Sequence, residues 1–182
     1  MKKTILTFGI ISGVLSLLMM AVTMLVSNHI GMDRGAIVGY TTIVLSFLLV
    51  YFGIRSYRDN LGAGQITFAR GFAIGISITL ISCVFYVLGW EILYFYFMPN
   101  FMDNYAAHAV AKAQASGASP AAIQSIVAQM KHYKELEDNP LTNAAMTFLE
   151  PFPVGLIITL ISAGILRKKS QTRAVRSVQA SS

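Results

Sequence analysis

The chain has 182 residues, of which 55% are hydrophobic and only 12% are charged. A soluble domain carries about 25% charged residues, because polar groups must cover its surface. The composition therefore excludes an ordinary soluble protein and indicates an integral membrane domain. The formal net charge is +6, but the lysines and arginines flank apolar runs, which is typical of anchors facing anionic lipid headgroups and not of nucleic-acid binding.

Four apolar runs predict transmembrane helices at about residues 5–26, 36–54, 68–97 and 146–166. A helix needs about 20 apolar residues to cross a hydrocarbon core about 30 Å thick. The first run is longer than the apolar region of a signal peptide and no typical cleavage site follows it, so we interpret it as a retained anchor. The third run is longer than a straight span requires and must tilt or project beyond the bilayer.

Glu150, Pro151 and Pro153 interrupt the fourth run. The stretch from Pro151 to Leu166 alone is slightly shorter than a full span. The fourth helix therefore either starts earlier and kinks, or uses the basic residues after Leu166 as a snorkelling end.

Lysine and arginine are concentrated in three segments, which predicts that these segments face the cytoplasm. The segments are the amino terminus, the loop between the second and third runs with Arg55, Arg58 and Arg70, and the end of the chain. Both termini are then cytoplasmic, and residues 170–182 form a disordered basic tail. The three loop arginines either bind an acidic lipid or a partner, or serve as ordinary anchors.

Residues 99–139 form the one long water-exposed segment, on the opposite side of the membrane. They predict an alanine-rich helix that ends at Gly117, then a second helix that starts at Ser119-Pro120. Apolar residues at helical spacing follow in the second helix. The expected fold is all-α: residues 1–169 form a single four-span membrane domain, a four-helix bundle with an extracytoplasmic helical hairpin between spans three and four.

Glu91 and Glu150 are acidic residues within the third and fourth runs. A carboxylate inside a bilayer is costly, so the pair is a candidate proton or cation site. Pro151 and Pro153 would leave backbone carbonyls of a continuous helix without partners, and such carbonyls are suitable cation ligands. The alternative is structural: each glutamate pins its helix at the interface, and the helix bends or simply starts at Pro151.

No motif in the chain predicts a catalytic, cofactor-binding or metal site. Gly62-x-Gly64 lacks the lysine and serine or threonine of a phosphate-binding loop, so it more simply turns the chain before Thr67 caps the third helix. The three histidines, His29, His108 and His132, lack the spacing of a helical zinc site. The Gly-x-x-x-Gly spacings in the first and third runs permit close helix approach within the chain or between copies.

Three short stretches of the chain are distinctive: Tyr57-Arg58-Asp59, then 64–68 (Gly-Gln-Ile-Thr-Phe) with Gly71 and Gly75, and finally 150–155 (Glu-Pro-Phe-Pro-Val-Gly). Together with the order of the features above, they resemble the bacterial Domain of Unknown Function 4199 family. The resemblance covers about residues 1–169 and implies the four-span architecture and a bacterial inner membrane. It implies no activity, because the family has none established.

Three functions follow as alternatives. The first is a non-enzymatic membrane component that acts through protein or lipid contacts of the hairpin or of the basic inner surface. The second is a small oligomeric proton- or cation-coupled transporter or channel that uses Glu91 and Glu150. The third, an intramembrane enzyme, has the least support in the sequence. The expected partners are the lipid bilayer and either further copies of the chain or another membrane protein.

Overall fold

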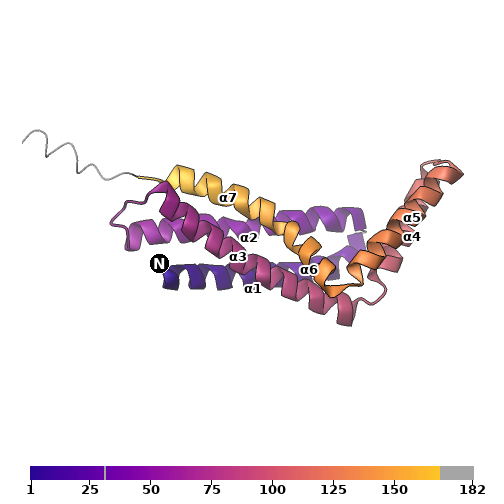
Figure 1. The fold of residues 1–182 in the computed structure, drawn as a ribbon, viewed down its shortest axis with the longest axis horizontal. Coiled ribbons are helices and arrows are strands. Elements are labelled where there is room, and N and C mark those ends of the chain that lie inside the picture. Colours follow the sequence, from indigo (N-terminus) through magenta and orange to yellow (C-terminus); the bar gives the residue numbers. More distant parts are fainter. Residues whose placement is uncertain (31, 169–182) are drawn as a thin grey trace, which may run out of the picture. The chain divides into compact units, whose positions relative to one another are not determined.

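The computed structural model of the chain describes residues 1–30 and 32–168, without the side chains of 25–33 and 36. Within that part no strand occurs, and the all-α prediction is confirmed (Figure 1). The predicted disordered tail, 170–182, lies outside the described residues. The elements are α1 (Lys2–Ile30), α2 (Met32–Asn60), α3 (Phe68–Ile92), the π-helical turn η1 (Leu93–Phe97), α4 (Phe101–Ala115), α5 (Pro120–Glu137), α6 (Pro140–Leu149) and α7 (Pro151–Leu166).

Four helical stretches of the described chain are long and apolar enough to cross a membrane: Lys2–Met24, Ile37–Asn60, Phe68–Phe97 and Pro140–Leu166. The chain is therefore a multi-pass membrane protein. The last stretch combines α6 and α7, so helical residues precede Glu150 and a second helix begins after it, at Pro151. Large apolar side chains are exposed along these stretches, as expected of helices surrounded by lipid.

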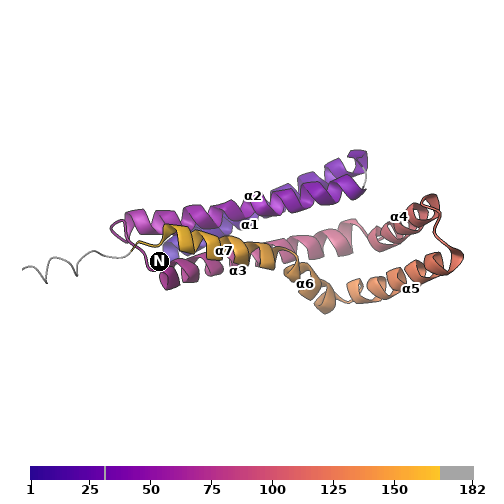
Figure 2. The ribbon, with the colours of Figure 1, turned by 90° about the horizontal axis from the view of Figure 1, so that it is seen from above.

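The chain folds as two compact units, each described here by itself. The first comprises residues 1–86 and the segment that begins at Glu150, which together contain α1, α2, most of α3 and α7. Here α2 packs against both α1 and α7 (Figures 1 and 2). The centre of this unit is a set of fully buried apolar side chains from α2 and α3, namely Phe47, Val50, Ile54, Ile74 and Ile78.

Glycines allow the helices of the first unit to approach closely. A Cβ atom at Gly13 would lie 2.5 Å from Phe85 Cγ, and one at Gly155 would lie 2.4 Å from Thr79 Cγ2. At Gly75 it would lie 2.8 Å from Thr159 Cγ2. These distances are shorter than any van der Waals contact, so no larger residue fits without movement. The glycine spacings in the first and third spans therefore serve packing within the chain.

Buried hydroxyl groups join the same helices. Ser12 donates a hydrogen bond of 3.0 Å to the Ser46 carbonyl, between α1 and α2. Thr79 and Thr159 hydroxyls lie 3.1 Å apart, between α3 and α7. Hydrogen bonds between membrane helices contribute about 0.6 kcal/mol to stability on average. These contacts therefore favour the same relative position of the helices as the close packing at the glycines.

The α2–α3 loop is tied to the end of α7. Ile66 and Lys168 exchange two backbone hydrogen bonds, of 3.3 and 2.9 Å. Thr67 Oγ1 accepts a hydrogen bond of 3.3 Å from the Arg70 amide, which confirms the predicted cap of the third helix. Two of the three basic segments of the sequence thus lie beside each other at one end of the first unit.

The second unit, residues 87–149, holds the end of α3, η1 and α4 to α6. Gly117 ends α4 with a φ of +75°, and the amides of Gly117 and Ala118 bond to carbonyls of the last turn. The Ser119 side chain accepts from the Ala122 amide and Pro120 opens α5. The end of α4 before Gly117 and the start of α5 at Pro120 are both where the sequence predicts them.

Candidate functional site

Glu150 occupies the position before α7 and is exposed. The Tyr86 hydroxyl, from α3, donates a hydrogen bond of 3.2 Å to Glu150 Oε2. Since α7 has 16 residues, this contact lies about 24 Å along the helix from Leu166, near one end of a hydrocarbon core. The Tyr86 hydroxyl is therefore the donor that the described residues give this carboxylate.

Pro151 and Pro153 lie in the first turn of α7, and Pro151 is buried. The helix begins at Pro151, as in the structural alternative, because the first residues of a helix need no amide partner there. A role of the neighbouring carbonyls as cation ligands stays a prediction.

Glu91 lies in the second unit, and Glu150 lies in the first. Their meeting as a pair therefore stays a prediction. The Glu91 atom Oε1 is enclosed and has no hydrogen-bond partner among the described residues. The π-helical turn η1 starts two residues later, and such turns are frequent at functional sites.

Aromatic rings hold the start of α4 within the second unit. The Trp90 and Phe101 rings meet edge to face with centroids 5.3 Å apart. The buried Tyr94 packs against both rings, and its hydroxyl donates a hydrogen bond of 3.1 Å to Asp138 Oδ1. The ends of α3, α4 and α5 are thereby joined through one side chain.

Asn143 fixes the corner between α5 and α6. Its side chain is fully buried and donates a hydrogen bond of 3.0 Å to the Glu137 carbonyl. It also accepts from Thr147 Oγ1 at 3.2 Å. The Thr142 hydroxyl bonds to the Leu136 carbonyl. The last carbonyls of α5, which a helix end leaves unpaired, are satisfied by these side chains.

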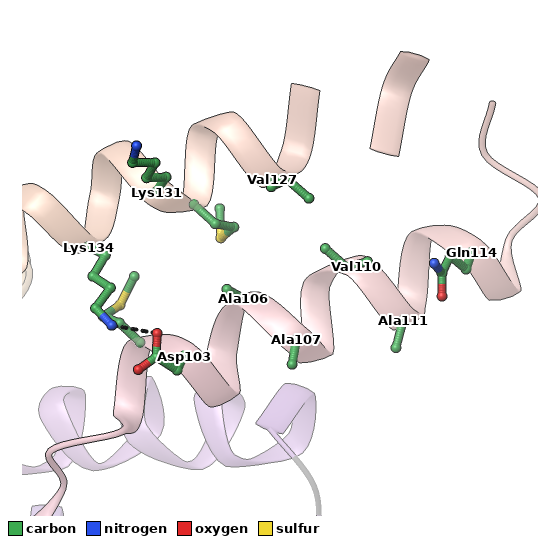
Figure 3. Close-up of a pocket in the computed structure, with 11 residues that line it drawn as sticks. Asp103, Ala106, Ala107, Val110, Ala111, Gln114, Val127, Lys131 and Lys134 are labelled. Carbon is green, nitrogen blue, oxygen red and sulfur yellow. Dashed lines mark hydrogen bonds and ion pairs between the residues drawn. The ribbon is translucent and has the colours of Figure 1, made fainter. Parts of the chain in front are cut away.

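An open groove of about 490 Å³ lies between α4 and α5 (Figure 3). Most of the residues that line it are small or apolar, and polar residues lie at both of its ends. The α4 wall consists of Met102, Asp103, Ala106, Ala107, Val110, Ala111 and Gln114, and the α5 wall of Val127, Met130, Lys131 and Lys134.

Lys134 and Asp103 form an ion pair across the groove, with Nζ and Oδ1 2.5 Å apart (Figure 3). The hydrogen bond to Asp103 raises the pKa of Lys134. Lys131 also lines the groove, but its amine points away from α4 (Figure 3), and it has no ion pair among the described residues. No residue of α5 is buried, and the apolar Val127 is 51% exposed.

The three loop arginines have different surroundings. Arg58 bonds to Asp59 at 2.7 Å, and Arg55 lies 3.5 Å from the same carboxylate. Arg70 is exposed and makes no ion pair within the described chain. A single acid therefore offsets two of the three cations, and Arg70 is the one open to an anion.

No group of three or more His, Cys, Asp or Glu is placed to hold a metal ion within the described ranges. The side chain of His29 lies outside them. The lone cysteine, Cys83, is buried in α3.

The sequence alone did not single out Tyr86, Asn143 or the groove. Tyr86 is an aromatic residue in an aromatic-rich span, and nothing in its neighbours marks it as a partner of Glu150. Asn143 follows Asn139-Pro140, which indicates a helix start but not a buried amide. The alanines of α4 that line the groove stand out in the sequence, but nothing in the sequence shows which helix they lie against.

Comparisons with curated proteins and with solved structures gave no match. The family model described as "Protein of unknown function (DUF4199)" matches residues 7–168, nearly the whole described chain. This multi-pass membrane protein therefore belongs to the DUF4199 family, as the resemblance of its sequence indicates.

Proposed function

We propose that this protein is a non-enzymatic component of a bacterial inner membrane that acts through contacts of its α4–α5 segment with lipid or with another membrane protein. The observation that carries the proposal is the groove between these helices together with the absence of any buried residue in α5. A helix with exposed apolar side chains gains free energy when another apolar surface covers them.

The proposal places both termini in the cytoplasm and α4–α5 on the opposite side. Support comes from the basic residues gathered beside the Ile66–Lys168 pairing, since cytoplasmic segments of membrane proteins carry the excess of lysine and arginine. Arg70, which lacks an ion pair in the described chain, is a second contact point for an acidic lipid or partner.

Site-specific photocrosslinking in intact membranes tests the proposal. A photoreactive phenylalanine analogue replaces Val127 or Val110, which line the groove, or Ala128, which is exposed on α5 and does not line it. We expect one dominant lipid or protein adduct from the two groove positions and none from Ala128. Equal, diffuse labelling at all three positions contradicts the proposal.

Native mass spectrometry of the protein extracted gently from its own membranes identifies the kind of contact. A mass that includes a second protein makes the chain an accessory subunit of that protein. A mass that includes only lipid makes the lipid contact the functional one. A lone, lipid-free chain, together with diffuse crosslinking, overturns the proposal.

The Tyr86–Glu150 hydrogen bond favours a second function, a small oligomeric proton- or cation-coupled transporter or channel. A carboxylate near the edge of the hydrocarbon core, held by a single hydroxyl, can bind a proton or a cation from water that reaches it. Glu91, with its enclosed oxygen, is the second candidate group.

Proton and cation flux into reconstituted vesicles tests this second function. We expect Glu150→Gln and Glu91→Gln to abolish flux if these groups carry it, because an amide does not ionise. Glu135→Gln, at an exposed residue of α5, is the matched control. If the unaltered protein shows no flux above empty vesicles, the second function is excluded.

A further inference from the structure

We infer that the end of the first unit where α3 begins and α7 ends binds the headgroup of an anionic phospholipid, phosphatidylglycerol being the simplest case. The residues that bind it are Arg70, Arg167 and Lys168, which are all exposed and are called the basic patch below. The inference rests on the proposed function, in which Arg70 contacts an acidic lipid or a partner, and states which of the two it contacts. Three features carry it: the backbone contacts that bring the cations together, the lack of a neighbouring acid, and the place of the patch at the ends of two membrane spans.

The backbone brings two of the three cations to the start of α3. Ile66 and Lys168 exchange backbone hydrogen bonds of 3.3 and 2.9 Å in an antiparallel pairing. Arg167 precedes Lys168 and has an extended backbone, so it lies opposite Thr67 with the two Cα atoms about 5 Å apart. Both ribbon views show the end of α7 beside the start of α3 (Figures 1 and 2).

Arg70 belongs to the same end of the unit. The Thr67 hydroxyl accepts a hydrogen bond of 3.3 Å from the Arg70 amide, so Thr67 lies between Arg70 and Arg167 along the backbone. The side chains of a helix lean toward its amino terminus. The Arg70 side chain therefore leans toward the end of α3 where Arg167 lies, and the three cations form one surface.

No acidic side chain that the structure describes in the first unit offsets this basic patch. The described acids of this unit are Asp59 and Glu150. Asp59 bonds to Arg58 at 2.7 Å and lies 3.5 Å from Arg55, and Glu150 lies at the opposite end of α7. Residues 151–182 contain no aspartate or glutamate and add no acidic side chain. The patch therefore presents its positive charge to an anion from outside the chain.

The position of the patch selects a phospholipid over a soluble anion. Phe68 and Leu166 are the end residues of two apolar stretches that are long enough to cross a membrane. The patch therefore lies at the level of the lipid headgroups. Beside the cations, Phe68 is 41% exposed and stacks on Phe72 with ring centroids 6.2 Å apart. These rings offer an apolar surface to an acyl chain, whereas a soluble anion would contact only the charges.

The chemistry of the cations favours an anionic headgroup over a zwitterionic one. A guanidinium group binds two phosphate oxygens through parallel N–H bonds, and a lysine amine adds a point charge. Each lysine or arginine near a membrane surface adds attraction for anionic lipid. Phosphatidylcholine carries the same phosphate but also a quaternary ammonium group, which the cations of the patch repel. The patch therefore prefers phosphatidylglycerol to phosphatidylcholine.

Native mass spectrometry of the purified full-length protein in a non-ionic detergent tests the inference. Phosphatidylglycerol and phosphatidylcholine with identical acyl chains are added in increasing amounts. We expect phosphatidylglycerol to bind at least about fivefold more tightly. Raising the salt from about 0.1 M to 1 M should weaken this preference, because the Debye length falls from about 10 Å to 3 Å. Glycerol 3-phosphate, which has no acyl chain, should not displace the lipid.

Substitutions in the patch show where the preference arises. Arg70→Gln and Arg167→Gln should each lower the affinity for phosphatidylglycerol about threefold to fivefold and leave the affinity for phosphatidylcholine unchanged. Arg34→Gln is the matched control and should change neither, because it removes an exposed cation at the opposite end of α2 from the α2–α3 loop. Arg70→Lys keeps the charge and should keep most of the preference. The salt series on the unaltered protein keeps the test decisive if a variant fails to fold.

Equal affinity for the two lipids, or a preference that does not change with salt, overturns the inference. Displacement of the lipid by glycerol 3-phosphate also overturns it, as does an equal loss of affinity in Arg34→Gln and Arg70→Gln, since that loss reports net charge and not a site. Each of these results leaves the proposed function standing if Val127 and Val110 give one dominant adduct in membranes. Diffuse crosslinking at those positions overturns the proposed function itself, whatever the lipid preference.

Discussion

The Tyr86 hydroxyl donates a hydrogen bond of 3.2 Å to the Glu150 carboxylate, which joins α3 to the residue that separates α6 from α7. The same two helices meet again two turns deeper, where the Thr79 and Thr159 hydroxyls lie 3.1 Å apart. Polar contacts thus accompany the α3–α7 packing at two depths. Their effect on stability can be separated from any role of Glu150 in transport.

We expect Tyr86→Phe to lower the free energy of unfolding by about 0.5–1.5 kcal/mol, because it removes the hydroxyl donor and keeps the ring. Unfolding in sodium dodecyl sulfate titrations measures the change. In a double-mutant cycle with Glu150→Gln, the two effects should be less than additive, since each removes part of the same contact. Full additivity shows that the hydrogen bond contributes nothing.

Gly155→Ala should destabilise the first unit by about 1–3 kcal/mol, because the added Cβ would lie 2.4 Å from Thr79 Cγ2 and 2.9 Å from Phe47 Cε1. Gly164→Ala, on the same helix, is the matched control, because no atom lies within 4 Å of its added Cβ. There we expect no loss, or a gain of up to about 1 kcal/mol from helix propensity. Equal effects of both variants contradict the close packing of α7.

Asn143→Ala should destabilise the α5–α6 corner by about 1–3 kcal/mol, because it leaves the Glu137 carbonyl and the Thr147 hydroxyl without a partner. Limited proteolysis between α5 and α6 should become faster. Asn104→Ala, at an exposed residue of α4, should leave the digestion pattern unchanged. A stable Asn143 variant with unaltered proteolysis means that the corner is held by other contacts.

The Lys134–Asp103 pair has a pH dependence with a defined sign. The hydrogen bond to Asp103 raises the pKa of Lys134, so the pair's contribution is present at neutral pH and is lost as pH rises through that pKa. Asp103→Asn should bring the pKa of Lys134 back toward its ordinary value, as nuclear magnetic resonance of labelled lysines can measure. An unchanged titration shows that the two groups do not interact in solution.

Cysteine labelling from each side of the membrane tests the proposed orientation. In a Cys83→Ala background, Leu61→Cys in the α2–α3 loop should react with an impermeant thiol reagent only from the cytoplasmic side. Ala121→Cys in α5 should react only from the other side. Both positions are exposed, so a lack of reaction reports the membrane barrier and not burial. Labelling from one side at both positions overturns the four-span topology.

Hydrophobic run length and turn chemistry in the sequence were enough to determine the all-α fold, the four apolar stretches and the helix boundaries at Thr67, Gly117 and Ser119. These features are local: a bilayer-length apolar run must satisfy its backbone within its own helix, and caps act over three or four residues. The Gly-x-x-x-Gly spacings are also visible in the sequence, but the side chains against which these glycines pack are not.

Only the tertiary structure decided which side chains meet. Tyr86 reaches Glu150 from a position 64 residues earlier in the chain, and Thr79 meets Thr159 across a similar separation. Nothing in one helix specifies which neighbour it faces or at what register, because those depend on how all the helices pack at once. The α4–α5 groove has the same origin, because its lining residues come from two helices and it depends on how those helices pack.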